Sequence, residues 1–177
     1  MAQLRVDHTA DLEPATLAAV RGLLFDVFGD DMSEADWEHA LGGVHALVVD
    51  DGVVIGHGAV VQRRLLYAGR ALRAGYVEGV AVRGDRRGAG HGRALMEALH
   101  RVIGAAYDVG ALAAAEDAFG FYARMGWQRW QGQTFSLTPA GLRRTADDDG
   151  GIFVLPLTMP LELSAGLACD WRDGDVW

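Results

Sequence analysis

Residues 45–82 contain three consecutive strand patterns joined by two-residue turns, and this arrangement limits the possible folds more than any other feature. Aliphatic residues dominate each run, and Asp51-Gly52 and Ala68-Gly69 interrupt them where tight hairpin turns are expected. We therefore predict three antiparallel strands, the last of which ends at Val82 or Arg83.

Helical periodicity and turn residues surround these strands. Apolar spacing predicts an amphipathic helix over 14–28, and Ser33 with Asp36 marks a capping box at the start of a second helix. The other predicted elements are a strand over 3–8, a helix after residue 90, a strand within 108–115, a helix over 116–126 ended by Gly126, and strands within 127–137 and 151–157. This order predicts one α+β domain over 1–177, with a mixed, mostly antiparallel sheet flanked by helices.

The composition restricts the partners. The chain has 24 acidic against 16 basic residues, a net charge of −8, which argues against nucleic acid and suits a cationic small molecule. No apolar run reaches the about 18 residues that a membrane span needs, and the N-terminus lacks a signal-peptide pattern. A single cysteine, Cys169, cannot form an internal disulfide, so a cytoplasmic location is the default expectation. The six histidines show no metal-ligand spacing, and no metal is expected.

The segment from Arg83 to Arg93 concentrates arginine and glycine between a predicted strand and a predicted helix. Such a junction favours anions, because free backbone N–H groups and the helix dipole meet there. The segment lacks the lysine of a P-loop, and it fits a dinucleotide fingerprint poorly because hairpins precede it. It does match the pattern [QR]-x-x-G-x-[GA] at Arg87 to Gly92, although a glycine-rich connector with solvated arginines is the simpler alternative.

With its flanking elements, this motif resembles the GNAT N-acetyltransferases, and the resemblance implies acetyl-CoA as co-substrate. It implies that the pyrophosphate is held by Arg87, Gly88, Ala89, Gly90, His91, Gly92 and Arg93. It also implies that the pantetheine arm pairs with the backbone of Val80, Ala81 and Val82. The resemblance further implies that Tyr122, in the segment FGFYARMGW, is the general acid that protonates the departing thiolate. A packed helix aromatic is the alternative interpretation of Tyr122.

Several separated segments also resemble the aminoglycoside 2′-N-acetyltransferases: ADWEHALGG, GYVEGVAVR, DDDG with FVLP, and CDWRDGDVW. An aminoglycoside is a polycation, so its site should be rich in carboxylates. By this resemblance the substrate contacts are Asp31, Asp36, Glu78, Gly79, Asp148 and the α-carboxylate on Trp177. Helix capping and exposed acidic turns are the alternatives for these acids. The resemblance also implies a homodimer.

Glu78 is the main candidate for chemistry, because a carboxylate in a half-buried strand needs a partner and an amine needs a base. We expect it to act through a water, with the Val80 N–H stabilising the oxyanion. An ion pair with Arg63 or Arg73 is the alternative.

Ala113, Ala114 and Ala115 replace a small hydroxyl residue of the family and put the substrate range in doubt. Acetylation of another small amine, such as a polyamine or amino sugar, and a non-catalytic acetyl-CoA-binding module are the alternative functions.

Overall fold

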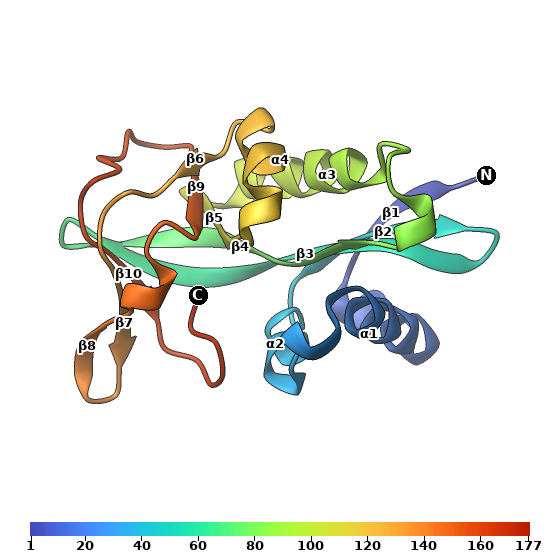
Figure 1. Cartoon of the computed structure of the whole chain (residues 1–177), viewed down its shortest axis with the longest axis horizontal. Coiled ribbons are helices and arrows are strands. Elements are labelled where there is room, and N and C mark those ends of the chain that lie inside the picture. Colours follow the sequence, from blue (N-terminus) through green and yellow to red (C-terminus); the bar gives the residue numbers. More distant parts are fainter. The chain divides into compact units, whose positions relative to one another are not determined.

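The computed structural model describes residues 1–177 and divides into two compact units. Unit 1 consists of Met1–Val61 and Val77–Val102, and unit 2 of Gln62–Tyr76 and Ile103–Trp177. Three elements contribute residues to both units: strands β3 (Val53–Tyr67) and β4 (Arg70–Val82) and helix α3 (His91–Ala106) (Figure 1). No helix is long and apolar enough to cross a membrane.

Unit 1 is built on the predicted hairpin. Strand β1 (Gln3–His8) pairs antiparallel with β2 (Val44–Asp50), and β2 pairs antiparallel with β3 from Val44↔Val60 to Asp50↔Val53. Asp51 and Gly52, which join β2 to β3, have φ values of 48° and 79°, as a type I′ hairpin turn requires. Ala68 and Gly69 make the same kind of turn between β3 and β4, with φ values of 48° and 74°. Both predicted turns are therefore confirmed.

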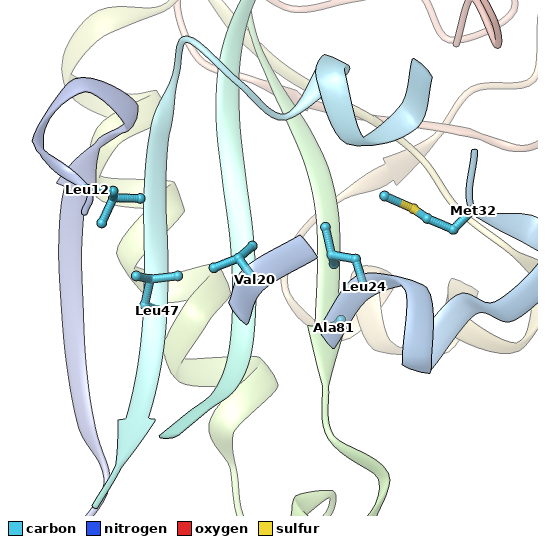
Figure 2. Close-up of a cluster of buried hydrophobic side chains, with 6 residues drawn as sticks. All are labelled: Leu12, Val20, Leu24, Met32, Leu47 and Ala81. Carbon is cyan, nitrogen blue, oxygen red and sulfur yellow. The ribbon is translucent and has the colours of Figure 1, made fainter. Parts of the chain in front are cut away.

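Helices cover both faces of the unit 1 sheet. Helix α1 (Pro14–Phe28) lies on one face and the unit 1 part of α3 on the other (Figure 1). The α1 side has a buried apolar cluster of Leu12, Val20, Leu24, Met32, Leu47 and Ala81 (Figure 2). On the α3 side, glycines allow close approach: a Cβ at Gly58 would lie 3.0 Å from the Leu99 Cδ1 atom. Helix α2 (Glu34–His39) begins with the predicted capping box of Ser33 and Asp36.

Unit 2 contains the rest of the sheet, in the strand order β6-β9-β5-β4-β3-β10-β7-β8. Its additional strands are β5 (Val109–Ala113), β6 (Gln128–Arg129), β7 (Thr134–Thr138), β8 (Gly141–Arg144), β9 (Ile152–Pro156) and β10 (Leu167–Asp170). Strand β5 runs parallel to β4 and β10 parallel to β7. The β3–β10, β5–β9, β6–β9 and β7–β8 pairs are antiparallel. The predicted α+β class with a mixed, mostly antiparallel sheet is confirmed.

Helix α4 (Phe119–Arg124) follows a 3-10 turn at Glu116–Ala118, and its aromatic rings contact Trp127 and Phe153 of unit 2. Trp127 and Trp130 are buried, whereas Trp171 is exposed. The helix is shorter than predicted because residues 116–118 form the tighter turn, and Gly126, with a φ of 88°, follows its end.

Strands β8 and β10 were not predicted from the sequence. Strand β8 is short and mostly exposed, so it lacks the apolar alternation by which a strand is recognised. Strand β10 lies in the C-terminal tail and depends on distant partners: the Arg63 Nε atom donates to Asp170 Oδ1 at 2.8 Å, and Arg63 Nη2 donates to the Asp170 carbonyl at 2.8 Å. Strand β8 pairs with the preceding strand β7 in a short hairpin, whereas β10 is set by tertiary contacts rather than by local pattern.

Candidate active site

Strand β4 contains a residue in the left-handed region. Gly79 has a φ of 57°, the conformation found at glycines of β-bulges, and it follows Glu78 directly. A Cβ at this position would lie 3.2 Å from the Leu24 Cδ1 atom and 3.4 Å from the His57 Nδ1 atom. Glu78, Gly79 and Val80 are half-buried between Val77 and Ala81, which are buried. An irregularity at Gly79 thus separates Glu78 from Val80.

A chain of hydrogen bonds leads away from Gly79 into the interior of unit 1. The His57 Nδ1 atom lies 2.7 Å from the Gly79 carbonyl oxygen, and His57 Nε2 lies 2.9 Å from His45 Nδ1. The His45 Nε2 atom lies 2.7 Å from the Thr9 hydroxyl. Burial lowers the pKa of His57 to about 3 and that of His45 to about 4, so both imidazoles are neutral at pH 7.

His45 and His57 had no predicted role. The signal that could have found them is their register: His57 pairs with Leu47, so His45 is its diagonal neighbour across the hairpin. Two polar residues at such positions within apolar strands are expected to contact each other. The turn position alone does not place them, because the register shifts by one residue between Val48 and Val49, and this irregularity brings the two side chains to the same face of the hairpin.

The predicted pyrophosphate loop begins where β4 ends. A 3-10 turn at Gly84–Arg86 leads to Gly88 and Gly90, with φ values of 80° and 84°, and α3 starts at His91. A Cβ at either glycine would meet no atom within 4 Å. Glycine is therefore favoured at these two positions by the positive φ values and not by crowding. Because neither residue has a side chain, the exposed backbone is open to a bulky anion.

The arginines around this loop have defined partners. Arg86 Nη1 donates to Asp50 Oδ2 at 2.7 Å, and Arg93 Nε donates to Glu97 Oε1 at 2.7 Å. Arg87 Nε donates to the Val82 carbonyl at 3.2 Å, which ties the loop to the end of β4. The exposed glycines, the start of α3 and the arginine side chains together fit a diphosphate group.

Tyr122 lies on α4 in unit 2. Its ring contacts those of Phe121, Trp127 and Phe153 at centroid distances of 5.2, 6.4 and 6.1 Å. Burial raises the pKa of the Tyr122 phenol to about 12. The phenol is therefore protonated at neutral pH, as a proton donor must be.

The three aspartates of the loop before β9 differ in their surroundings. Arg144 and Thr134 bond to Asp149 and hold the pKa of that carboxyl at about 2, which gives it a structural role. Asp147 is exposed. Asp148 is half-buried, and burial together with the charge of Asp175 raises its pKa. A half-buried carboxylate beside other acids is stabilised by a cation.

Trp177 is buried in unit 2 and is anchored close to this loop. Its indole Nε1 donates to the Thr145 hydroxyl at 3.0 Å, and Arg172 Nη2 donates to its backbone oxygen at 3.1 Å. The Cys169 thiol donates to the carbonyl of the preceding Val176 at 3.2 Å. The buried Cys169 thus has a packing role.

The N-terminal acids of the predicted substrate site lie in unit 1. Asp31 is exposed at the end of a 3-10 turn, Gly29–Asp31. The Asp36 Oδ2 atom accepts bonds from the Ser33 N–H at 2.8 Å and the Ser33 hydroxyl at 2.7 Å. The capping role that the sequence offered as the alternative for Asp36 is therefore present, and its role toward a substrate stays a prediction.

The predicted site residues fall into two groups. Unit 1 brings together Gly79, its flanking residues and the arginine-glycine loop, and it also holds Asp31 and Asp36. Unit 2 contains Tyr122, Asp148 and Trp177, and it joins the last two through Thr145. The structure contains no cluster of three or more His, Cys, Asp or Glu side chains that could hold a metal ion.

Comparison with known proteins identifies the family and the fold. The model of the acetyltransferase (GNAT) domain family matches residues 10–130. A GNAT family N-acetyltransferase, YhbS from Escherichia coli in complex with CoA, has a TM-score of 0.64 at 21% identity, covering 94% of this chain and 88% of the other. A GNAT acetyltransferase from Brucella melitensis in complex with acetyl-CoA has a TM-score of 0.63 at 18% identity, covering 97% of each chain. These two likenesses establish the fold.

The chain therefore belongs to the GNAT acetyltransferases. Within that class it is similar to a particular enzyme, the aminoglycoside 2′-N-acetyltransferase of Mycolicibacterium fortuitum. The two sequences are 52% identical over 177 residues, which covers 98% of this chain and 91% of that protein.

Proposed function

We propose that this acetyltransferase transfers the acetyl group of acetyl-CoA to the 2′-amine of aminoglycosides. The observation that carries the proposal is the 52% identity, over nearly the whole chain, to an aminoglycoside 2′-N-acetyltransferase. The acidic composition and the raised pKa of Asp148 support a cationic acceptor independently of that relative.

The donor site is the loop between β4 and α3. We assign the pyrophosphate to the backbone from Gly88 to Gly92 and to the side chains of Arg87 and Arg93, because the left-handed glycines expose N–H groups at a helix start. Val80, Ala81 and Val82 present the backbone for the pantetheine arm. Two GNAT structures crystallised with CoA and with acetyl-CoA support this choice of donor.

The acceptor site is the set of acids that the family pattern implies. Asp148 is the strongest of them, because its half-buried carboxylate lies beside Asp175 and gains from a cation. Asp31, Asp36 and Trp177 complete the proposed contacts. Each ammonium group of the substrate can donate charge-assisted hydrogen bonds to these carboxylates.

The chemistry is direct transfer. Glu78 accepts a proton from the 2′-ammonium group through a water, and the free amine attacks the thioester carbonyl. The Val80 N–H stabilises the oxyanion, a new C–N bond forms, and the C–S bond breaks. Tyr122 donates its proton to the departing thiolate. The second proton, which the nitrogen loses as the amide forms, returns to Tyr122 through solvent, and Glu78 releases the first proton to solvent. Holding both substrates together supplies much of the acceleration.

A paired assay tests the acceptor. Release of CoA thiol is measured with tobramycin, which carries a 2′-amine, and with amikacin, which carries a 2′-hydroxyl. The proposal expects turnover with tobramycin alone. Turnover with both would move the acetylated amine elsewhere, and turnover with neither would favour another small amine or a non-catalytic acetyl-CoA-binding module.

Two predictions about the assembly accompany the proposal. A single domain over 1–177 is expected to unfold in one cooperative transition, measured by calorimetry. A homodimer is expected in light scattering, and a monomer at micromolar concentration would contradict it.

A further inference from the structure

We propose that His57 is a positioning residue: its hydrogen bond to the Gly79 carbonyl fixes the part of β4 that presents the Glu78 carboxylate and the Val80 N–H. The inference rests on the proposed function for the roles of Glu78 and Val80. The geometry on which it stands belongs to unit 1 alone.

The carbonyl at one end determines the tautomers along the whole chain of hydrogen bonds. Because the Gly79 carbonyl can only accept, the His57 Nδ1 atom carries the proton. The His57 Nε2 atom then accepts, so His45 Nδ1 donates and His45 Nε2 accepts from the Thr9 hydroxyl. The Gly42 N–H donates to that hydroxyl at 2.9 Å. One arrangement of protons therefore satisfies every member of the chain.

Both histidines are inaccessible, each with 0% exposure. Water cannot replace either of them, and an unpaired carbonyl in this interior would carry the full cost of its desolvation. Gly79 needs such a partner because its positive φ takes it out of regular strand geometry. Losing the donor is therefore expected to change the backbone at Gly79, and this shift moves Glu78 and Val80, its immediate neighbours.

The surroundings argue against a catalytic role for His57 itself. The charged and titratable groups near the pair are Asp7 and His8 of β1, which act on the pKa of His45, and His45, which acts on that of His57. Its two ring nitrogens are occupied by Gly79 and His45. A neutral imidazole with both nitrogens bonded has no lone pair for a substrate proton.

Two variants separate the hydrogen bond from the packing. His57→Asn keeps a donor near the position of Nδ1, whereas His57→Leu keeps the apolar volume and removes the donor. We expect His57→Leu to lower kcat by roughly 10- to 100-fold, as small displacements of reacting groups do, and to raise the KM for acetyl-CoA by a smaller factor, because Val80 is the one displaced residue among the three that pair with the pantetheine arm. The Asn variant should retain most of kcat. Circular dichroism and the melting temperature establish that both variants are folded.

A spectroscopic readout keeps the inference testable without turnover. In nitrogen-15 spectra, wild-type His45 and His57 should both appear as neutral Nδ1–H tautomers. The Val80 amide resonance should shift in His57→Leu and stay near its wild-type position in His57→Asn. If the wild type acetylates no aminoglycoside, the proposed function fails while this amide shift still tests the positioning. An unmoved Val80 resonance in folded His57→Leu, or equal kcat in both variants, would overturn the inference.

Discussion

The indole Nε1 atom of Trp177 donates to the Thr145 hydroxyl at 3.0 Å, and the same hydroxyl lies 2.9 Å from that of Thr134. Thr145 also bonds to the Asp148 side chain, which lowers the pKa that burial raises. One buried threonine therefore connects two of the proposed substrate contacts, Asp148 and Trp177. This connection explains how a solvent-facing loop and the chain's last residue are held in fixed positions.

Thr145→Val should loosen both contacts without touching the donor loop. The change leaves the buried indole N–H without its partner, so we expect a stability loss of about 1–3 kcal/mol, measured by denaturant unfolding. The KM for tobramycin should rise while the KM for acetyl-CoA stays unchanged. Thr158→Val, at an exposed threonine of unit 2, is the control and should stay within about 0.5 kcal/mol of wild type. Equal effects of the two variants would contradict the role of Thr145.

Asp148 and Asp147 are adjacent acids with different surroundings, and we expect them to respond differently. Asp148→Asn should raise the KM for tobramycin by roughly 10-fold or more, since a hydrogen bond to a charged group is worth about 1.5–3 kcal/mol. Asp147→Asn, at the exposed neighbour, should leave it nearly unchanged.

The raised pKa of Asp148 adds a pH dependence. The group takes up a proton at a higher pH than an ordinary aspartate, so substrate affinity should weaken as the pH falls through that raised value. Measuring the KM for tobramycin between pH 4 and pH 8 in the wild type and in Asp148→Asn checks this. A wild-type profile that matches that of Asp148→Asn would count against the carboxylate.

Glu78→Gln should affect turnover far more than cofactor binding. Removing a general base costs roughly 10²- to 10⁴-fold in kcat, whereas the dissociation constant of acetyl-CoA should change little. Stopped-flow thiol release and calorimetric titration measure the two quantities. Glu38→Gln on α2, an exposed carboxylate, is the matched control and should behave as wild type. Parallel losses of kcat and acetyl-CoA affinity would assign Glu78 to the donor site instead.

Gly90→Ala tests the donor loop against a glycine of the adjoining helix. Because Gly90 has a φ of 84°, alanine is strained there, and the KM for acetyl-CoA should rise. Gly104→Ala, within α3 and with no atom near its Cβ position, should instead stabilise the protein by up to about 1 kcal/mol. Initial rates over acetyl-CoA concentration and thermal unfolding check both statements. An unchanged KM in Gly90→Ala would remove the loop from the donor site.

The buried histidines predict acid sensitivity. Their pKa values fall from 6.5 in the unfolded chain to about 3 for His57 and about 4 for His45, so the unfolded state binds more protons below pH 6.5. The free energy of unfolding should therefore be unaffected by these groups above pH 6.5. As the pH falls from there toward about 4, it should decrease by up to about 1.4 kcal/mol per pH unit for each histidine.

Denaturant unfolding of wild type and His57→Asn between pH 4 and pH 8 measures this slope. The variant should lose the contribution of one histidine and show a shallower decline. Identical slopes would mean that His57 is protonated within the fold.

The sequence predicted the parts of the fold that local chemistry determines. Both hairpin turns, α1 and the capping box at Ser33 depend on residues close together in the chain, and all were predicted correctly. Strand β10 was missed because Arg63 and Asp170, whose contact secures it, lie far apart in sequence.

The same distinction applies to the candidate site. The arginine-glycine loop is a local motif and was found, with its glycines in the left-handed region. The pairing of His45 with His57 depends on strand register, and the link from Thr145 to Trp177 depends on how the tail packs. Neither contact could be inferred from residue spacing alone.

The most direct measurement of the central claim is the position of the acetyl group on the product. Tobramycin offers several amines, and carbon-proton correlation spectra of the acetylated product distinguish them. The account predicts a single new amide on the 2′-nitrogen. A product acetylated at another amine would leave the acetyltransferase class intact and contradict the proposed substrate site.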